Sequence, residues 1–396
     1  MKKLILLISA FAINGIVNSQ TVQRTMYNLP DTGQTTSYTA TFGEDNDYNI
    51  YTQSFTDNSN GTITDNITGL MWQQGDSGEL TVENGILYCN NLVLGGFSDW
   101  RLPTKEESVS ILNLDRNNPP LNVTYFPATT AGYWWTSTVS FLNANSIWVI
   151  NAGGGVGPKL KTETTSAGGT FKFHARAVRD VATPVNVTNF TDIGDGTILD
   201  NVTGLMWQKS PVTTTYTWEQ ALAYAESLSA STYSDWRLPN IKELISLNSE
   251  TSNAPSINTT FFPTVASARY WSSSTLLSAA GTSAWFNDFQ NSGITSYDLK
   301  TISHNVICVR GTPVNLALNE TKYNSDSIKA SPNPFVSKIK ISALTGNENF
   351  ELYDNLQRQI FKGKNIEQQD FSSLAKGIYY LRIIDNNEKT IKLIKE

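Results

Sequence analysis

The sequence predicts an α+β protein that contains one domain twice, followed by a C-terminal module of antiparallel strands. Three observations support this. Long motifs occur twice along the chain, each copy combines hairpin signals with two short helices, and residues 331–396 contain strands of alternating polarity. Segregated helices and antiparallel strands are typical of the α+β class. A repeat of this length indicates whole domains rather than the short units of a solenoid.

The duplication runs through most of the chain. Phe55-Thr-Asp recurs as Phe190-Thr-Asp, and the Ser-Asp-Trp-Arg-Leu-Pro motif at 98–103 recurs at 234–239. The spacing between the copies drifts by a few residues, which indicates loop insertions. We predict the following parts: repeat 1 at 21–180 with an N-terminal lead-in, a linker at 181–189, repeat 2 at 190–311, a linker at 312–330, and the C-terminal module at 331–396.

Each copy opens with a tight turn, Asn-Gly at 60–61 and Asp-Gly at 195–196. Such turns between β-type runs are strong hairpin signals. The surrounding segments 57–61 and 192–196 carry side-chain oxygens, and calcium takes about six to eight oxygen ligands. Because a hairpin accounts for these residues fully, we predict no metal or cofactor, with calcium at the two turns as the alternative.

Two helices follow in each copy. Apolar residues at helical spacing predict a helix over 217–228 and a weaker one over 81–92, where Gly85 lowers helix propensity. After the Arg-Leu-Pro motif, Thr104 and Asn240 each stand three residues before a glutamate. This spacing predicts a capping box at the start of a second helix in each copy. Short aromatic strands complete the domain.

Residues 1–20 have the order of an export signal: Lys2 and Lys3, an apolar run, then a polar exit. The run is too short to span a bilayer and is typical of a signal peptide. No other run is long and apolar enough to form an anchor, so we expect none after cleavage. The formal net charge is −6, and the acidic excess lies before residue 331. This excludes nucleic acid as the expected partner, since phosphate binding needs clustered positive charge.

Several motifs together resemble a known family. A Trp-Glu-x-Ala helix at 218–221 precedes the Trp-Arg-Leu-Pro-x-x-x-Glu run at 236–243, as in the sulfatase-modifying-factor superfamily. The hairpin motif, the Thr-Gly-Leu-Met-Trp strand and the closing Val-Arg narrow this further, and both copies are similar to the Lcl C-terminal domain family. The resemblance covers about residues 29–311. It implies C-type-lectin-like domains and polysaccharide binding.

The C-terminal module resembles the sorting domain of type IX secretion, an antiparallel β-sandwich. This resemblance implies recognition by the type IX secretion machinery and a secreted or outer-surface location, reached through the periplasm. The residues that carry it are Pro332, Asn333, Pro334, Gly377, Tyr379, Lys392 and Lys395.

No catalytic constellation is visible, and we expect no enzyme. The formylglycine-generating relatives use paired cysteines, whereas each copy here has one. His174 and His304 do not align between the copies and have no nearby cysteine, so they do not make up a zinc site. Asp99 and Asp235 recur, but each lies two residues before an arginine with which it could pair. Carboxylate catalysis is the minor alternative.

Aromatic residues are the better candidates for ligand contact. Adjacent strand residues point to opposite faces, so one ring of Trp134-Trp135 belongs to the core and the other is free to be exposed. Trp134 aligns with Tyr270, and we leave core packing and sugar stacking open for this position. A Trp-Phe-Asn-Asp strand is faintly similar to the calcium-ligand strand of C-type lectins. The predicted ligand-binding residues are Trp134, Tyr270, Trp148, Trp285, Asn151, Asn287 and Asp288.

The two cysteines stand at different positions of the two copies. Cys89 lies where repeat 2 has Ala225, and Cys308 lies where repeat 1 has Ala177. Lcl-like domains often carry cysteine at both positions, which implies a contact between the first helix and the last strand. We favour two buried thiols over a Cys89–Cys308 disulfide, which would require an exchange of strands or a close interface.

From these observations we expect a secreted or surface-displayed binding protein that contacts glycans or another surface polymer. The alternative is a structural or protein-binding surface component, because a fold of this kind does not fix function.

Overall fold

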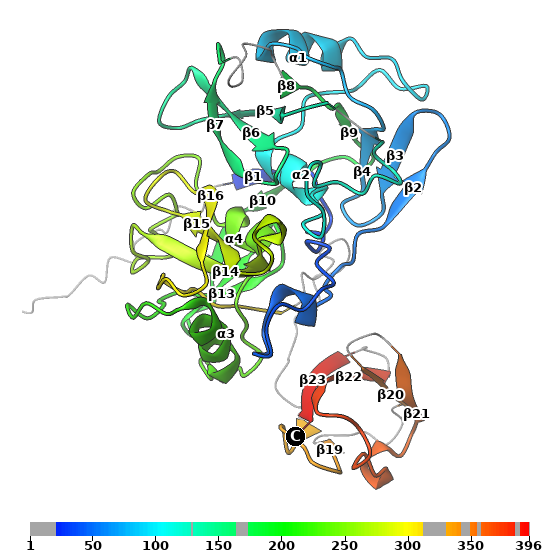
Figure 1. Cartoon of the computed structure of the whole chain (residues 1–396). Coiled ribbons are helices and arrows are strands. Elements are labelled where there is room, and N and C mark those ends of the chain that lie inside the picture. Colours follow the sequence, from blue (N-terminus) through cyan, green and yellow to red (C-terminus); the bar gives the residue numbers. More distant parts are fainter. Residues whose placement is uncertain are drawn as a thin grey trace, which may run out of the picture.

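The computed structural model describes residues 21–127, 130–163, 173–311, 330–341, 349–354, 358–384 and 389–395 (Figure 1). In these ranges the protein is mostly β-sheet with few helices. The predicted signal peptide and most of the predicted linker at 312–330 lie outside the described residues.

Repeat 1 contains two four-stranded sheets. The first has the order β2-β3-β4-β9 and is antiparallel. Its strands are β2 (Phe55–Asp57), β3 (Thr62–Asp65), β4 (Leu70–Gln73) and β9 (Val178–Asp180). The second has the order β7-β6-β5-β8, in which only β8 runs parallel to its neighbour. Its strands are β5 (Tyr133–Val139), β6 (Ser146–Asn151), β7 (Val156–Leu160) and β8 (Phe173–His174).

Repeat 2 has the same arrangement. One sheet has the order β11-β12-β13-β17, and the other has the order β14-β15-β16. The strands of the first are β11 (Phe190–Asp192), β12 (Thr197–Asp200), β13 (Met206–Gln208) and β17 (Val309–Arg310). Those of the second are β14 (Arg269–Thr275), β15 (Ser283–Asp288) and β16 (Ile294–Leu299). A single parallel bridge between Tyr270 and Asn305 takes the place of β8.

The four predicted helices are present, as α1 (Val82–Asn90), α2 (Lys105–Ser110), α3 (Trp218–Ser227) and α4 (Ile241–Ser246). Both predicted capping boxes are confirmed: Thr104 with Glu107, and Asn240 with Glu243. Gly85 has a packing role in α1. A Cβ atom there would lie 3.3 Å from Ala175 Cβ, so glycine allows the helix to approach that segment closely.

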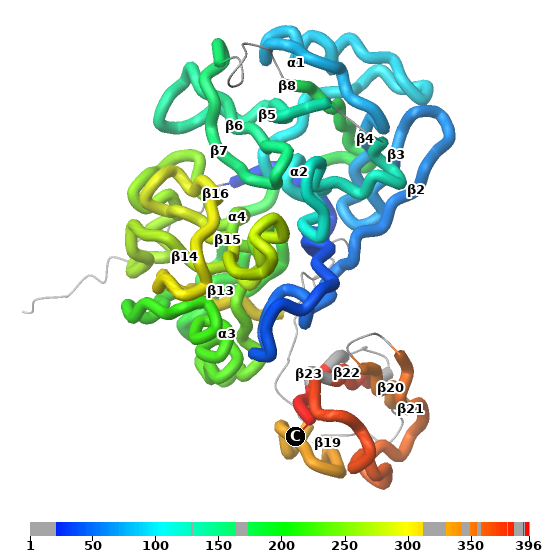
Figure 2. The backbone as a smooth tube through the Cα atoms, viewed as in Figure 1, coloured from blue at the N-terminus to red at the C-terminus, as the bar shows by residue number. Residues whose placement is uncertain are grey.

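The lead-in connects the two repeats. Strand β1 (Thr21–Arg24) pairs with β10 (Val185–Thr188), so part of the predicted linker at 181–189 is a strand, which corrects the prediction. Further along, Gln34 Nε2 donates to Leu114 O at 3.3 Å and to Thr275 O at 2.5 Å. In the tube of Figure 2, the blue lead-in passes α2 of repeat 1 and continues to α3 of repeat 2. The Gln34 side chain thus binds backbone carbonyls of both domains, which helps to hold the repeats together.

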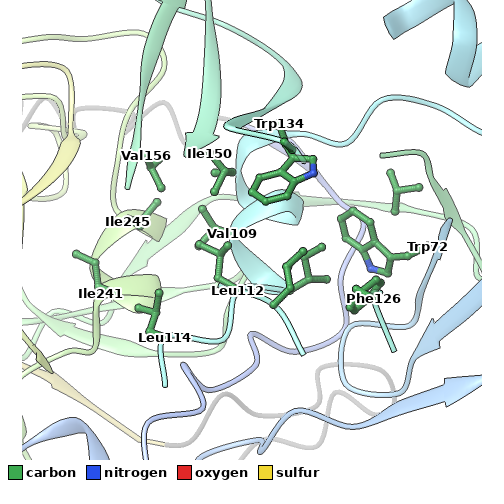
Figure 3. Close-up of a cluster of buried hydrophobic side chains, with 14 of the residues drawn as sticks. Trp72, Val109, Leu112, Leu114, Phe126, Trp134, Ile150, Val156, Ile241 and Ile245 are labelled. Carbon is green, nitrogen blue, oxygen red and sulfur yellow. The ribbon is translucent and has the colours of Figure 1, made fainter. Parts of the chain in front are cut away.

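The repeats also share a core. The buried side chains Val109 and Ile150 of repeat 1 belong to the same hydrophobic cluster as Ile241 and Ile245 of repeat 2 (Figure 3). This cluster removes apolar surface of both repeats from water, which stabilises the pair by about 25 cal/mol for each Å² buried.

The C-terminal module contains a four-stranded antiparallel sheet and a two-stranded one, packed around a core of its own. The larger sheet has the order β21-β20-β22-β23. The strands of both sheets are β18 (Ala330–Ser331), β19 (Lys340–Ile341), β20 (Asn349–Asp354), β21 (Gln359–Gly363), β22 (Gly377–Ile384) and β23 (Lys389–Lys395).

Candidate binding site at the junction of the repeats

The predicted aromatic position at β5 is part of the core. Trp134 and Trp135 are 6% and 1% exposed. Trp134 packs in the cluster that contains Trp72, while Trp135 stacks on Phe173 with ring centroids 4.2 Å apart. Of the two alternatives left open for Trp134, the structure shows core packing. Strand alternation sent the rings to opposite faces, but both faces of this sheet are covered.

Tyr270, the counterpart of Trp134 in repeat 2, is also buried. It is 1% exposed, and its hydroxyl oxygen accepts a hydrogen bond from Ala266 N at 2.8 Å. Burial raises the pKa of Tyr270 to about 12. Neither Trp134 nor Tyr270 presents a ring face on which a sugar could stack.

Trp148 is covered by an ion pair that joins the repeats. Its Nε1 donates to Glu250 Oε2 at 3.1 Å. Lys105 Nζ lies 4.5 Å from the centre of the indole and pairs with Glu250. Lys105 comes from α2 of repeat 1 and Glu250 from the segment after α4 of repeat 2. The pair satisfies two buried groups and closes the surface above Trp148.

The predicted polar residues hold loops in place. Asn151 Oδ1 accepts hydrogen bonds from Gly153 N at 2.8 Å and Gly155 N at 3.0 Å. Asn287 Nδ2 donates to Asn248 Oδ1 at 2.7 Å. The Asp288 carboxylate accepts from Asn291 Nδ2 at 2.8 Å, and Arg269 Nε lies 3.4 Å from it. These bonds order the loops next to the junction of the repeats.

The recurring aspartates have partners other than those predicted. Asp99 Oδ1 accepts from Arg179 Nε, and Asp235 Oδ1 accepts from Arg310 Nε, both at 2.7 Å. The prediction that each pairs with the arginine two residues later is therefore wrong. Arg101 and Arg237 instead bind the capping-box glutamates.

The turns considered for calcium form local hydrogen bonds. Asp57 Oδ1 accepts from Ser59 N at 2.8 Å, and Asp192 Oδ2 lies 2.6 Å from Lys209 Nζ. Across the part of the chain that the structure describes, no group of three or more His, Cys, Asp or Glu is placed to hold a metal ion.

Trp285 is 5% exposed and lines an open cleft between the repeats. The cleft is a shallow hollow of about 200 Å³, a volume that includes space open to solvent. Repeat 1 contributes the loop after α2 and the tip of the β6–β7 hairpin, and repeat 2 contributes Trp285 and the loop after β14. The lining residues are Leu114, Arg116, Asn117, Gly153, Leu276, Leu277, Ser278 and Trp285. We call this the junction cleft.

Equivalent residues of the repeats meet beside this cleft. Val156 lies two residues before Pro158, the strand partner of Trp148. Thr295 lies two residues before Tyr297, the strand partner of Trp285, so Val156 and Thr295 are equivalent. Val156 N donates to Thr295 Oγ1 at 2.7 Å. Val109 and its counterpart Ile245 share one cluster. The repeats thus meet through the same surface of each copy, as subunits do in a two-fold symmetric dimer.

This arrangement produces two related sites at the junction, a closed one over Trp148 and an open one beside Trp285. At one, Lys105 and Glu250 lie over Trp148. At the junction cleft, the positions that correspond to Lys105 and Glu250 are Ile241 and Leu114. Apolar side chains replace the ion pair there, and the space beside Trp285 stays open.

The rim of the junction cleft is polar and exposed. Arg116, Asn117 and Ser278 are exposed, and the side chains of Arg116 and Asn117 make no hydrogen bond or ion pair with the described parts of the chain. The Trp285 ring is packed edge-on against Tyr297, with centroids 6.0 Å apart, and Tyr297 is 55% exposed. Of the predicted site residues, Trp285 lines the cleft and Asn151 orders its Gly153 wall. Arg116 and Asn117 lie in a loop and Ser278 in a short 3-10 helix (Leu277–Ala279). None of the three carries a sequence pattern that marks a ligand site, so none was predicted.

Comparison with protein families matches both repeats to one domain. Residues 61–179 and 196–310 match the Lcl C-terminal domain. The chain belongs to the Lcl C-terminal domain family. Residues 329–396 match the secretion system C-terminal sorting domain. The protein is therefore secreted or located at the outer cell surface, and its tail interacts with the type IX secretion machinery.

Other comparisons add little to this assignment. No curated protein matches the chain. A solved structure of PorZ, a bacterial surface component of the type IX secretion system of Porphyromonas gingivalis, is 10% identical with a TM-score of 0.17. The alignment covers 63% of this chain and 29% of the PorZ chain. A TM-score this low supports no statement about fold or function. None of the described helices of this Lcl family member is long and apolar enough to cross a membrane.

In the sorting domain, the predicted motif residues lie on neighbouring segments. Pro332, Asn333 and Pro334 lie between β18 and β19, while Gly377 and Tyr379 lie on β22. Asn333 Oδ1 accepts a hydrogen bond from Ile394 N on β23 at 2.7 Å, which fastens the opening segment to the last strand. That strand also carries the two predicted lysines, Lys392 and Lys395.

The cysteines of the two Lcl repeats are free and buried. Cys89 and Ala177 belong to one hydrophobic cluster, and Cys308 and Ala225 belong to another. Burial raises the pKa of Cys89 to about 12 and also raises that of Cys308. The free-thiol prediction is therefore confirmed, and so is the helix–strand neighbourhood that the resemblance implied.

Proposed function

We propose that this protein is a surface-displayed binding protein that recognises glycan chains of a surface polymer in the junction cleft. The observation that carries the proposal is an open cleft between the repeats whose rim offers unpaired polar side chains, next to the half-exposed ring of Tyr297 that packs against the buried Trp285. The Tyr297 ring is 55% exposed, and an exposed aromatic ring with a polar edge suits the face of a sugar ring.

The rim supplies the complementary polar contacts. The Arg116 guanidinium donates hydrogen bonds, the Asn117 amide donates and accepts, and the Ser278 hydroxyl does both. A few convergent polar groups around an apolar surface are typical of small-ligand sites. An acidic chain favours a neutral polymer over a sulfated one, since like charges repel. We propose binding, not catalysis, on a C-type-lectin-like scaffold.

An apolar patch supports a second function, contact with another protein. Four side chains at the far end of the second sheet of repeat 1 are between 44% and 59% exposed: Val139, Phe141, Leu142 and Leu160. Exposed apolar groups of this kind mark protein contacts more often than sugar contacts. This patch lies on repeat 1, whereas the junction cleft draws on both repeats, so the two functions can be tested separately.

The test is a binding screen of the mature chain, residues 21–396, against neutral and acidic polysaccharides, with calcium and with a chelator. We expect neutral polymers to bind. Ser278→Trp should block the cleft and reduce affinity at least about tenfold, which corresponds to about 1.4 kcal/mol. Leu142→Trp is the matched control, because Leu142 is the exposed counterpart of Ser278 in repeat 1.

Two outcomes would count against the glycan proposal. One is equal binding by the wild type and the Ser278→Trp variant. The other is no binding to any polymer of the panel, which would favour the protein-contact function. Loss of binding in chelator would instead point to a cation at the site.

A further inference from the structure

Repeat 1 contains a small cavity behind β5, separate from the junction cleft. It leaves about 20 Å³ for the centre of a water-sized sphere, which is enough for one water molecule or one monatomic ion. Most of its lining is apolar, from residues such as Ile111, Leu112 and Ile150, but Trp134 and Arg176 also line it.

Arg176 lies in the segment between β8 and β9. Its neighbours Ala175 and Ala177 pack in the core that contains Trp135, whereas Arg176 lines the cavity together with Trp134. Arg176 is only 3% exposed, and its guanidinium lies 5.1 Å from the Phe126 ring centre. A positive charge is therefore buried beside the cavity.

The Arg176 guanidinium is only partly satisfied by the protein. Nη1 donates to Gln73 O at 3.0 Å and Gln74 O at 2.5 Å. Nε and Nη2 are buried without an acceptor among the described residues. Asp76 Oδ2 lies 3.8 Å from Nη2, beyond hydrogen-bond range, and Asp76 Oδ1 lies 2.8 Å from His174 Nδ1. Burial lowers the pKa of Arg176 to about 10.

Trp134 adds a third donor of the same kind. Its Nε1 is buried and has no acceptor within the described ranges. Trp72 also lines the cavity and its Nε1 is likewise without an acceptor. The same is true of its repeat 2 counterpart Trp207, so this nitrogen does not distinguish the two repeats. Figure 3 shows the indole of Trp134 beside that of Trp72 within the cluster.

These donors define the chemistry of the occupant. All three are N–H groups and two of them belong to the charged guanidinium, so the occupant must accept hydrogen bonds and is favoured if it is negatively charged. A water molecule has two lone pairs and no net charge. A spherical anion accepts from all three donors. Asp76, 3.8 Å from Nη2, offsets part of the charge of Arg176 but accepts no hydrogen bond from that nitrogen, so the anion removes the cost of buried N–H groups without an acceptor.

We propose that repeat 1 binds one small inorganic anion of halide size, held by Arg176 Nε, Arg176 Nη2 and Trp134 Nε1. Repeat 2 cannot bind one in this way, because Ile307 and Tyr270 occupy the corresponding positions. Tyr270 already has its hydroxyl paired with Ala266 N. The site is thus a difference between two copies of one domain.

The probes are chloride and bromide, added to the mature chain at constant ionic strength against gluconate, which is too large for the cavity. We expect the midpoint of thermal unfolding to rise with halide and saturate, as mass action requires for binding to the folded state. Crystals soaked in bromide should show an anomalous peak within hydrogen-bond range of Arg176 and Trp134.

Three variants make the test specific. Arg176→Met, which keeps the length of the side chain without its charge, should abolish the halide response. Trp134→Phe keeps a ring and removes one donor, and should weaken the apparent affinity about tenfold. It also serves if the methionine variant does not fold. Trp207→Phe in repeat 2 is the control and should leave the response unchanged.

A saturable response that is equal in all of these proteins would indicate an adventitious ion only and overturn the proposal. A midpoint that does not depend on halide, or a water molecule at the cavity in a bromide-soaked crystal, would overturn it as well. None of these results depends on whether the junction cleft binds glycan.

Discussion

The capping arginine and glutamate occur in both repeats, but their surroundings differ. In repeat 2, the side chains of Arg237 and Glu243 are 5% and 4% exposed, and the Tyr48 ring of the lead-in lies 5.4 Å from the guanidinium. In repeat 1, the Arg101 side chain is 30% exposed and also pairs with Asp180 at 2.7 Å. One motif is therefore a fully buried ion pair in one copy and a partly solvated network in the other.

The cause is the lead-in, which covers repeat 2 although it precedes repeat 1 in the chain. Thr39 and Thr41 donate to Glu219 of α3, both at 2.8 Å, and the Tyr48 hydroxyl pairs with Glu226. Lys242 Nζ of α4 donates to Asp31 O at 2.8 Å. A segment attached to the first copy thus completes the second, which makes the copies unequal despite their similar sequences.

Glutamate-to-glutamine changes should show this inequality most strongly. Glu243→Gln leaves Arg237 charged and buried, and we expect it to lower the free energy of unfolding by about 3–5 kcal/mol. Glu107→Gln should cost about half as much, because Asp180 still neutralises Arg101. Urea unfolding of both variants measures the difference. Equal losses would mean that the lead-in does not isolate the repeat 2 pair from solvent.

Added cysteines would test whether the helix–strand contact is the same in both copies. Ala225→Cys should form a disulfide with Cys308, and Ala177→Cys one with Cys89. Each would close a long loop and raise the free energy of unfolding by about 2–4 kcal/mol under oxidising conditions. Peptide mapping and unfolding with and without reductant provide the measurement. A bond in one copy only would show that the helices are placed differently.

The closed site over Trp148 can be made like the junction cleft by a double substitution. Glu250→Leu alone leaves Lys105 buried beside Glu106, 3.3 Å away, and should cost about 2–3 kcal/mol of unfolding free energy. Adding Lys105→Ile reproduces the Ile241 and Leu114 pair of the junction cleft. We expect the double variant to return to within about 1 kcal/mol of the wild type, since apolar replacements of buried pairs are often neutral. A double variant as unstable as Glu250→Leu would show that the shape of the cleft, not its charge, differs.

The smallest expected effect is a pH dependence centred on Asp200, whose counterpart in repeat 1 is Asp65. Burial raises the pKa of Asp200 from 3.8 to about 6, against hydrogen bonds from Thr203 and Val202 that lower it. Between these pH values the folded state binds the proton more tightly than the unfolded state. The stability contribution of Asp200 therefore falls as pH rises through that window, by on the order of 1–2 kcal/mol.

Asp200→Asn should remove this part of the pH profile, as measured by urea unfolding between about pH 4 and pH 7. Burial also raises the pKa of Asp65, so Asp65→Asn is the matched variant in the other copy. An unchanged profile in the Asp200→Asn protein would show that Asp200 titrates in the folded state as it does in the unfolded chain.

Local signals predicted the elements of this fold well. The capping residues Thr104 and Asn240 placed both second helices, and the Asn-Gly and Asp-Gly turns placed both hairpins. These signals work because each depends on hydrogen bonds or dihedral preferences within a few residues. The candidate site was predicted less well. Trp285 was identified, but Arg116, Asn117 and Ser278 were not, because polar loop residues carry no pattern that marks a ligand.

The sequence by itself determined the duplication, the order of helices and strands, the export route and the membership of the Lcl family, since all of these are written in local motifs. Only the tertiary structure decided which surfaces remain open. Alternation sends Trp134 and Trp135 to opposite faces, but contacts between segments far apart in the chain bury both. The same physical reason explains why the site over Trp148 is closed and the junction cleft is open. The burial of a residue depends on which distant segments cover it, and here the lead-in and the other repeat are those segments.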